Sequence, residues 1–129
     1  MKALGVDAVE LERIEETLSR HGQQFLDKIL TAAEQSLIGP KSGPGAGEGP
    51  LTFVAGRFAA KEAVLKVLGT GWAKGLGFRD VEVLRDPDGR PHVVLHGVAA
   101  ERAAVLGFTQ ILVSITHTRR DAIAVAAAD

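Results

Sequence analysis

The acids and bases of this sequence that could act together lie near the N-terminus and in a long helical stretch. Asp7 follows an apolar segment, and Glu62 and Lys66 are four residues apart, which places them on successive turns of a helix. Two carboxylates suit Mg²⁺ when substrate phosphates complete its ligands, and an ammonium group beside them can bind phosphate oxygens. These residues indicate an Mg²⁺–phosphate site. The alternatives are a helix N-cap at Asp7 and a surface ion pair between Glu62 and Lys66.

Two further cations precede this pair on the same predicted helix. Arg57 lies nearer the start of the helix, where the helix dipole favours anions. Lys61 falls near the centre of an apolar stripe. The stripe consists of Val54, Phe58, Leu65 and Leu68. The ordinary interpretation is that the stem of Lys61 covers apolar surface while its ammonium reaches water.

A serine, a histidine and two glycines are weaker candidates. Ser114 and His117 lie late in a predicted strand at positions that do not share a face, so a Ser–His pair is disfavoured. His117 could be a polar residue at a strand end or an acid–base group. Gly69 and Gly71 follow the long helix, where they could end it or let the backbone approach a ligand.

Alternating strand and helix patterns indicate the elements that position these residues. In the second half, turn residues over 86–91 separate the two strands of a predicted hairpin. A Gly/Pro-rich segment over 39–50 is predicted to be a flexible loop. The pattern predicts an α+β domain with a largely antiparallel sheet and helices packed on one face. The predicted strands are 2–7, 80–85, 92–96, 110–117 and 122–127. The first predicted helix begins near Val9 and ends at a stop signal, His21-Gly22. The other predicted helices are 25–30, 32–38, 52–68 and 98–106, with Thr31 as the N-cap of 32–38.

Composition limits the class of protein. The 129 residues suit a single domain over 1–129, and the net charge of −1 argues against nucleic-acid binding. The apolar runs are too short to cross a membrane, so a cytoplasmic protein is expected. The absence of Cys excludes disulfides and a cysteine nucleophile. Because the chain is small and poor in aromatic residues, association into an oligomer would add to its stability.

Three blocks of sequence resemble one known family. They are GVDAVELERI at 5–14, AGRFAAKEAVLKVLGTG at 55–71 and VSITHT at 113–118, and the DGRP turn at 88–91 also fits. Together they resemble holo-acyl-carrier-protein synthases, the short trimeric class of 4′-phosphopantetheinyl transferases. The resemblance implies the fold of that class and transfer of 4′-phosphopantetheine from coenzyme A to a serine of apo-acyl carrier protein. It also implies Mg²⁺ as cofactor, a homotrimer with sites between protomers, and a cytoplasmic role in fatty acid biosynthesis.

The resemblance also assigns roles to residues. Asp7 and Glu62 correspond to the Mg²⁺ ligands, and Lys66 to the group that neutralises the diphosphate. Arg13 and Arg20 lie on the helix that faces the acidic carrier protein. The residues placed at coenzyme A are Arg57, Lys61, Lys66, Gly69, Gly71, Ser114 and His117. The proton of the attacking serine could pass to Glu62, to His117 or to a metal-bound water, and the sequence leaves these alternatives open.

The sequence departs from the family pattern in a few places. Only Lys41 is basic in the 39–50 segment, where relatives often carry several basic residues near the nucleotide. Phe58 stands where many relatives have Trp, and Thr116 where Ser is common. Two other functions fit the residues alone: a non-catalytic ligand-binding module, and an Mg²⁺-dependent hydrolase of nucleotide pyrophosphates.

Overall fold

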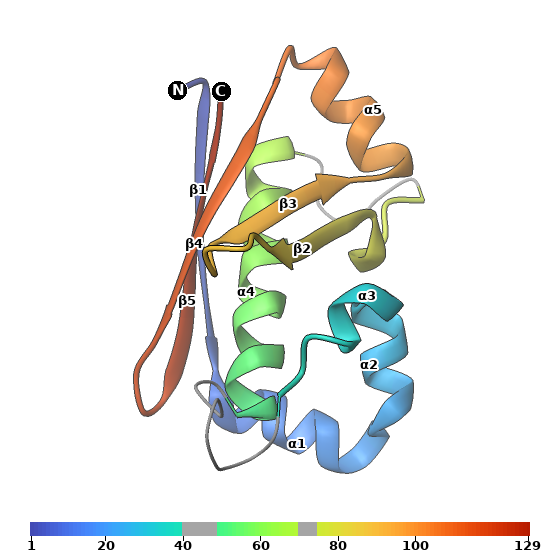
Figure 1. Cartoon of the computed structure of the whole chain (residues 1–129), viewed down its shortest axis with the longest axis vertical. Coiled ribbons are helices and arrows are strands. Elements are labelled where there is room, and N and C mark those ends of the chain that lie inside the picture. The colour runs from blue at the N-terminus through green and yellow to red at the C-terminus, as the bar shows by residue number, and fades with distance from the viewer. Residues whose placement is uncertain (40–48, 70–74) are drawn as a thin grey trace.

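The computed structural model describes residues 1–39, 49–69 and 75–129. Within these ranges, five strands form two antiparallel sheets (Figure 1). The larger sheet has the order β1-β5-β4, formed by β1 (Ala3–Glu10), β5 (Asp121–Ala128) and β4 (Ile111–His117). The smaller one is a hairpin of β2 (Val81–Arg85) and β3 (Pro91–Leu95). The α+β class with antiparallel pairing is therefore confirmed, with the strands divided between two sheets.

The helices pack on one side of the larger sheet, with α4 against the sheet itself (Figure 1). They are α1 (Leu11–His21), α2 (Gln23–Ile29), α3 (Ala32–Gln35), α4 (Pro50–Leu68) and α5 (Gly97–Val105), with a short 3₁₀ turn, η1 (Phe78–Asp80). In the parts of the chain that the structure describes, no helix is long and apolar enough to cross a membrane.

α4 is the central helix of the fold. It contacts both sheets as well as α1 and α5, and most of its residues are buried. The apolar stripe expected from the sequence packs into the core, but burial extends well beyond it, because a helix surrounded by other elements is buried on nearly every side. Its ends agree better with the sequence pattern. Pro50 occupies the first turn, and Gly69 ends the helix with a left-handed φ of 76°.

Small residues let α4 approach the larger sheet closely. A Cβ on Gly5 of β1 would lie 2.5 Å from the carbonyl oxygen of Ala63 on α4, so only glycine fits there. On β5, alternate residues are alanines with no exposed surface. These are Ala122, Ala124, Ala126 and Ala128. The close contact places β1 directly beside the last turns of α4.

The opposite face of this sheet, here named the outer face, carries exposed apolar side chains. Leu4 is 61% exposed and Val6 is 54% exposed, both on β1. Leu112 on β4 and Val125 on β5 are 50% and 39% exposed. Because successive side chains of a strand point to opposite faces of the sheet, these side chains point away from α4. The sheet is apolar on both faces.

The structure corrects two predicted boundaries. The first strand does not end at Asp7, because β1 continues to Glu10 and pairs with β5 throughout. Asp7 lies opposite Ala124 on the face toward α4, where its polarity does not interrupt the pairing. Consequently α1 begins at Leu11, and Asp7 does not cap a helix. α3 is also shorter than expected, and its predicted N-cap, Thr31, is confirmed by a capping box with Glu34.

Candidate active site

Asp7 of β1 and Lys66 of α4 lie side by side. The Nζ atom of Lys66 is 3.2 Å from Oδ1 of Asp7 and donates a hydrogen bond of 2.8 Å to the carbonyl oxygen of Val6. The Asp7 side chain is 19% exposed and that of Lys66 is 56% exposed. A partly shielded carboxylate and an accessible ammonium are therefore adjacent at the surface. The structure brings together these two residues that the sequence singled out.

Glu62 lies one turn before Lys66 on α4 and is partly buried. Within the described ranges, no group of three or more His, Asp or Glu residues could hold a metal ion. Carboxylates from β1 and α4 are nevertheless a chemically suitable pair of ligands for Mg²⁺, which uses few protein ligands when phosphate oxygens supply the others. Asp7 and Glu62 thus fit a metal that binds together with a phosphate substrate.

Lys61 does not have the role that the sequence suggested. Its side chain has no exposed surface, so its ammonium neither reaches water nor is open to coenzyme A. The Nζ atom donates to Oε1 of Glu34 at 2.8 Å and to the carbonyl oxygens of Phe78 and Val81 at 2.9 and 2.7 Å. Burial lowers the pKa of Lys61, and the nearby charge of Glu34 opposes that shift. Lys61 therefore belongs to the interior of the protein.

Glu34 is the residue that sequence reasoning missed. It is fully buried on α3, and its Oε2 accepts a hydrogen bond of 2.8 Å from the backbone N–H of Val83. Its Oε1 accepts another from the backbone N–H of Thr31 at 2.8 Å. One signal was available, because a lysine within an apolar stripe needs an acid as a partner when its ammonium is buried and does not reach water. The sequence did not indicate which acid supplies it.

Arg57 also contacts protein groups. Its residue surface is only 4% exposed, and its Nε and Nη2 donate to the carbonyl oxygens of Val83 and Leu84 at 3.2 and 3.4 Å. The guanidinium carbon lies 4.4 Å from the centroid of the Phe53 ring. Arg57 therefore ties α4 to β2, a structural role that was not predicted. Its contact with coenzyme A stays a prediction.

Ser114 and His117 are exposed on β4 but do not form a pair. Ser114 lies opposite Val125 and shares the outer face of the sheet, whereas His117 lies three residues further along, opposite Ala122, at the end of the strand. Gly69 donates its backbone N–H to the carbonyl of Leu65, so it ends α4. Gly71 and Lys41, also considered from the sequence, lie outside the described residues.

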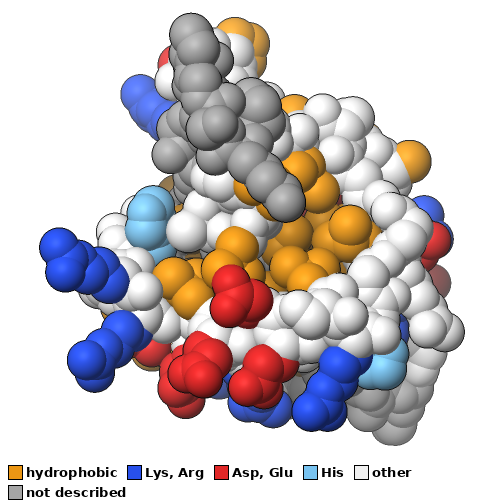
Figure 2. Space-filling view, turned by 90° about the horizontal axis from the view of Figure 1, so that it is seen from below, with side chains coloured by type: hydrophobic (Ala, Val, Ile, Leu, Met, Phe, Trp, Pro, Cys, Tyr) orange, Lys and Arg blue, Asp and Glu red, His pale blue; other side chains and the backbone are white. Residues whose placement is uncertain are grey.

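Arg13 and Arg20 are exposed on α1, two turns apart on one side of the helix. Glu16 lies between them, at i+3 from Arg13 and i−4 from Arg20. Figure 2 shows a hollow at this end of the molecule, with hydrophobic side chains inside it and charged side chains around it. One concavity here lies between α1 and the start of α4, with Leu18 and Leu51 among its lining residues.

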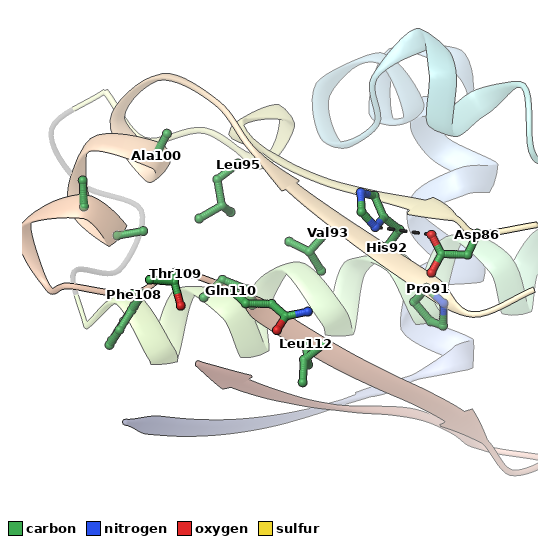
Figure 3. Close-up of a pocket in the computed structure, with 13 residues that line it drawn as sticks. Asp86, Pro91, His92, Val93, Leu95, Ala100, Phe108, Thr109, Gln110 and Leu112 are labelled. Atoms are coloured by element: carbon green, nitrogen blue, oxygen red, sulfur yellow. Dashed lines mark ion pairs between the residues drawn. The ribbon is translucent and has the colours of Figure 1, made fainter. Parts of the chain in front are cut away.

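A groove of about 460 Å³ runs between β3 and β4 and is bounded by α5 (Figure 3). Its walls combine apolar side chains, including Val93, Leu95 and Phe108, with polar groups, and an ion pair of 3.3 Å joins His92 to Asp86 at one side. Of the predicted site residues that the structure describes, none lines this groove. The residues that carry the proposed chemistry therefore lie elsewhere, where β1 meets α4.

Comparison with known proteins decides the family. The family description "4′-phosphopantetheinyl transferase superfamily" matches residues 3–126. The chain belongs to this superfamily. Among named phosphopantetheinyl transferases, the holo-[acyl-carrier-protein] synthase of Solidesulfovibrio magneticus is 50% identical over 125 residues, covering 97% of this chain and 95% of that protein. The resemblance of the three sequence blocks is thus confirmed.

Solved structures of phosphopantetheinyl transferases show the same fold. The holo-[acyl-carrier-protein] synthase of Neisseria meningitidis has a TM-score of 0.85 and 29% identity, covering 100% of this chain and 98% of that chain. The Helicobacter pylori synthase, solved in complex with coenzyme A, has a TM-score of 0.81 and 29% identity, covering 98% and 99% of the two chains. The α+β arrangement around α4 is therefore that of the phosphopantetheinyl transferases.

Proposed function

We propose that this phosphopantetheinyl transferase moves 4′-phosphopantetheine from coenzyme A to a serine of apo-acyl carrier protein, releasing adenosine 3′,5′-bisphosphate. The observation that carries the proposal is the pairing of Asp7 with Lys66 where β1 meets α4, with Glu62 one turn away. The named relatives, which are holo-acyl-carrier-protein synthases, support the choice of substrates.

Asp7 and Glu62 hold Mg²⁺ in this proposal, and Lys66 binds the diphosphate of coenzyme A. Mg²⁺ supplies positive charge that stabilises the oxygens on which negative charge develops. The ammonium of Lys66 is accessible and needs only to turn from Asp7 and Val6 toward phosphate oxygens. The charges that lower the barrier are thus held on two rigid elements before substrate binds.

The reaction exchanges one phosphorus–oxygen bond for another. The serine oxygen of the carrier attacks the β-phosphorus, the bond to the bridging diphosphate oxygen breaks, and adenosine 3′,5′-bisphosphate leaves with that oxygen. The serine proton passes to a base, for which the chain offers the carboxylate of Glu62 and the imidazole of His117. Gly69 and Ser114 are proposed to contact coenzyme A. This assignment follows the family resemblance and the exposure of both residues.

The carrier protein is proposed to bind along α1. Arg13 and Arg20 present two positive charges about 10 Å apart along the helix axis, which suits an acidic partner. Because exposed charges act mainly through long-range attraction, they would speed association more than they would tighten the complex. Since an acyl carrier protein is the acceptor, the enzyme would serve fatty acid biosynthesis in the cytoplasm.

A homotrimer is the proposed assembly, with a second copy of the chain covering the outer face. The exposed side chains of Leu4, Val6, Leu112 and Val125 support this, because monomeric proteins rarely leave such a continuous apolar area uncovered. Ser114 lies on the same face, so a neighbouring copy seated there would lie beside a proposed coenzyme A contact. Light scattering should then give three times the chain mass, and Val6→Lys should reduce it.

Mass spectrometry of apo-acyl carrier protein incubated with the enzyme, coenzyme A and Mg²⁺ tests the proposed reaction. We expect the carrier to gain one phosphopantetheinyl group, and EDTA to prevent the gain. Cleavage of coenzyme A without an acceptor would instead indicate a pyrophosphate hydrolase. Binding of coenzyme A with no cleavage and no transfer to several carrier proteins would indicate a binding module.

A further inference from the structure

The charged pair of Glu34 and Lys61 lies in the interior and takes no part in the proposed reaction. Their side chains have no exposed surface, and Nζ of Lys61 is 2.8 Å from Oε1 of Glu34. The same ammonium donates to the carbonyl oxygens of Phe78 and Val81. A lysine ammonium has three hydrogens to donate, so these acceptors use all of them.

Glu34, the other member of the pair, also bonds to backbone groups of neighbouring elements. Its carboxylate accepts hydrogen bonds from the backbone N–H of Thr31, which precedes α3, and from that of Val83 on β2. The pair therefore connects the start of α3, α4, η1 and β2. A buried ion pair is weak evidence of stabilisation, since apolar side chains of similar volume often serve as well. A role in fixing geometry is the better-supported reason for retaining one.

The position of Lys61 in α4 shows what the pair could fix. Glu62 is the next residue and Lys66 lies five residues on, so their side chains project about 100° and 140° around the helix from Lys61. Any rotation of α4 would move both of them relative to Asp7 on β1. One turn earlier, Arg57 is also bonded to carbonyl oxygens of β2. Two successive turns of α4 are thus attached to one strand.

We propose that Glu34 and Lys61 are positioning residues, which fix the rotation of α4 against β2 and so set where Glu62 and Lys66 lie relative to Asp7. The inference rests on the proposed function, because it requires those three residues to form the site. Residues that orient metal ligands without binding the metal themselves change metal affinity or activity by about 10- to 100-fold when they are mutated. We expect an effect of that size here.

The double variant Glu34→Gln/Lys61→Met tests the role without leaving one buried charge unpaired. Mn²⁺ replaces Mg²⁺ as the probe, and its binding is followed by electron paramagnetic resonance with coenzyme A present. We expect a cooperative thermal transition, Mn²⁺ affinity and kcat both lower by about 10- to 100-fold, and an unchanged KM for the carrier. Lys2→Met is the matched control, because Lys2 also donates to a carbonyl, that of Gly107, but in an exposed hydrogen bond.

Glu34→Asp is the second variant, for use if the double variant fails to fold. It keeps the charge but withdraws the carboxylate by one methylene, so Mn²⁺ affinity and kcat should again fall. A folded variant of either kind with wild-type Mn²⁺ affinity and kcat overturns the positioning role alone. A wild-type enzyme that binds no Mn²⁺ with coenzyme A present overturns the proposed function and this inference together.

Discussion

Lys66 lies 3.2 Å from Asp7, although 59 residues separate them in the chain. The contact joins the middle of β1 to the last turns of α4, and the missing side chain of Gly5 permits that approach. A diphosphate arriving there would meet an ammonium and a carboxylate already held side by side. The proposed site would therefore need little rearrangement to bind a diphosphate together with a cation.

Asp7→Asn should lower kcat by about 100-fold or more, because it removes one proposed Mg²⁺ ligand and the charge beside Lys66. The melting temperature should change little, since a partly exposed ion pair contributes little to stability. Steady-state kinetics and thermal melting measure the two effects. Asp88→Asn, which removes an exposed acid paired with Arg90, is the control and should leave kcat unchanged. Full activity of Asp7→Asn would exclude the metal assignment.

Gly5→Ala should destabilise the protein by about 1–3 kcal/mol, as overpacked substitutions generally do. The new Cβ would lie 2.5 Å from a backbone oxygen, that of Ala63, which cannot turn aside as a flexible side chain can. Chemical denaturation measures the change. Because β1 must move away from α4, kcat should fall as well. Wild-type stability would show that the two elements separate easily.

Arg13→Glu should raise the KM for the carrier at low salt by about 5-fold, which corresponds to about 1 kcal/mol for a reversed exposed charge. The difference should shrink as salt is added, because screening weakens exposed charges. Kinetics at two ionic strengths measure it, with Arg85→Glu at the end of β2 as the control. A KM that stays at the wild-type value in low salt would show that α1 does not bind the carrier protein.

Glu16→Gln should lower the KM for the carrier by about 2- to 5-fold at low salt, the opposite direction from the arginine variant. Glu16 lies between Arg13 and Arg20 on α1, where its charge offsets their attraction for an acidic partner. The same assay measures the effect. Glu101→Gln, an exposed change of the same kind on α5, serves as the control. An increase in KM would mean that Glu16 contacts the carrier directly.

Acid should weaken the fold partly through Glu82. Burial raises the pKa of Glu82, but hydrogen bonds from Thr31 and His96, together with the electrostatic attraction of His96 and Lys61, outweigh it and leave the pKa below its ordinary value of about 4.5. The ionised carboxylate therefore stabilises the folded chain above pH 4.5, and that contribution is lost as the pH falls through the lower folded pKa. Glu82→Gln should show a shallower loss of melting temperature below pH 4.5. An identical slope in wild type and variant would contradict this.

Local signals in the sequence predicted much of the fold. Thr31 and Gly69 mark a helix start and a helix end because caps depend on nearby backbone groups. The predicted end of the first strand at Asp7 is wrong, because a single acid does not end a strand. Asp7 instead occupies an ordinary paired position facing α4. A strand tolerates a polar side chain where a neighbouring group, here Lys66, forms an ion pair with it.

The candidate site was predictable in its residue types but not in its contacts. Asp7, Glu62 and Lys66 stood out through charge and spacing, and the structure places Asp7 against Lys66. The expectation that the Lys61 ammonium reaches water is wrong, because its partner Glu34 is 27 residues away and on another helix. Periodicity describes one element at a time, so it cannot show which distant side chain enters the same interior space.

The alanines of β5 determine the register in which this strand pairs with its neighbours. In many sheets a one-residue slip is prevented because it would exchange polar and apolar faces. That safeguard is weak here, since both faces are apolar. A slip would instead turn Ile123 and Val125 toward α4, where Ala122 and Ala124 have no exposed surface and little room remains. Side-chain size, and not polarity, therefore selects the alignment of β5 between β1 and β4.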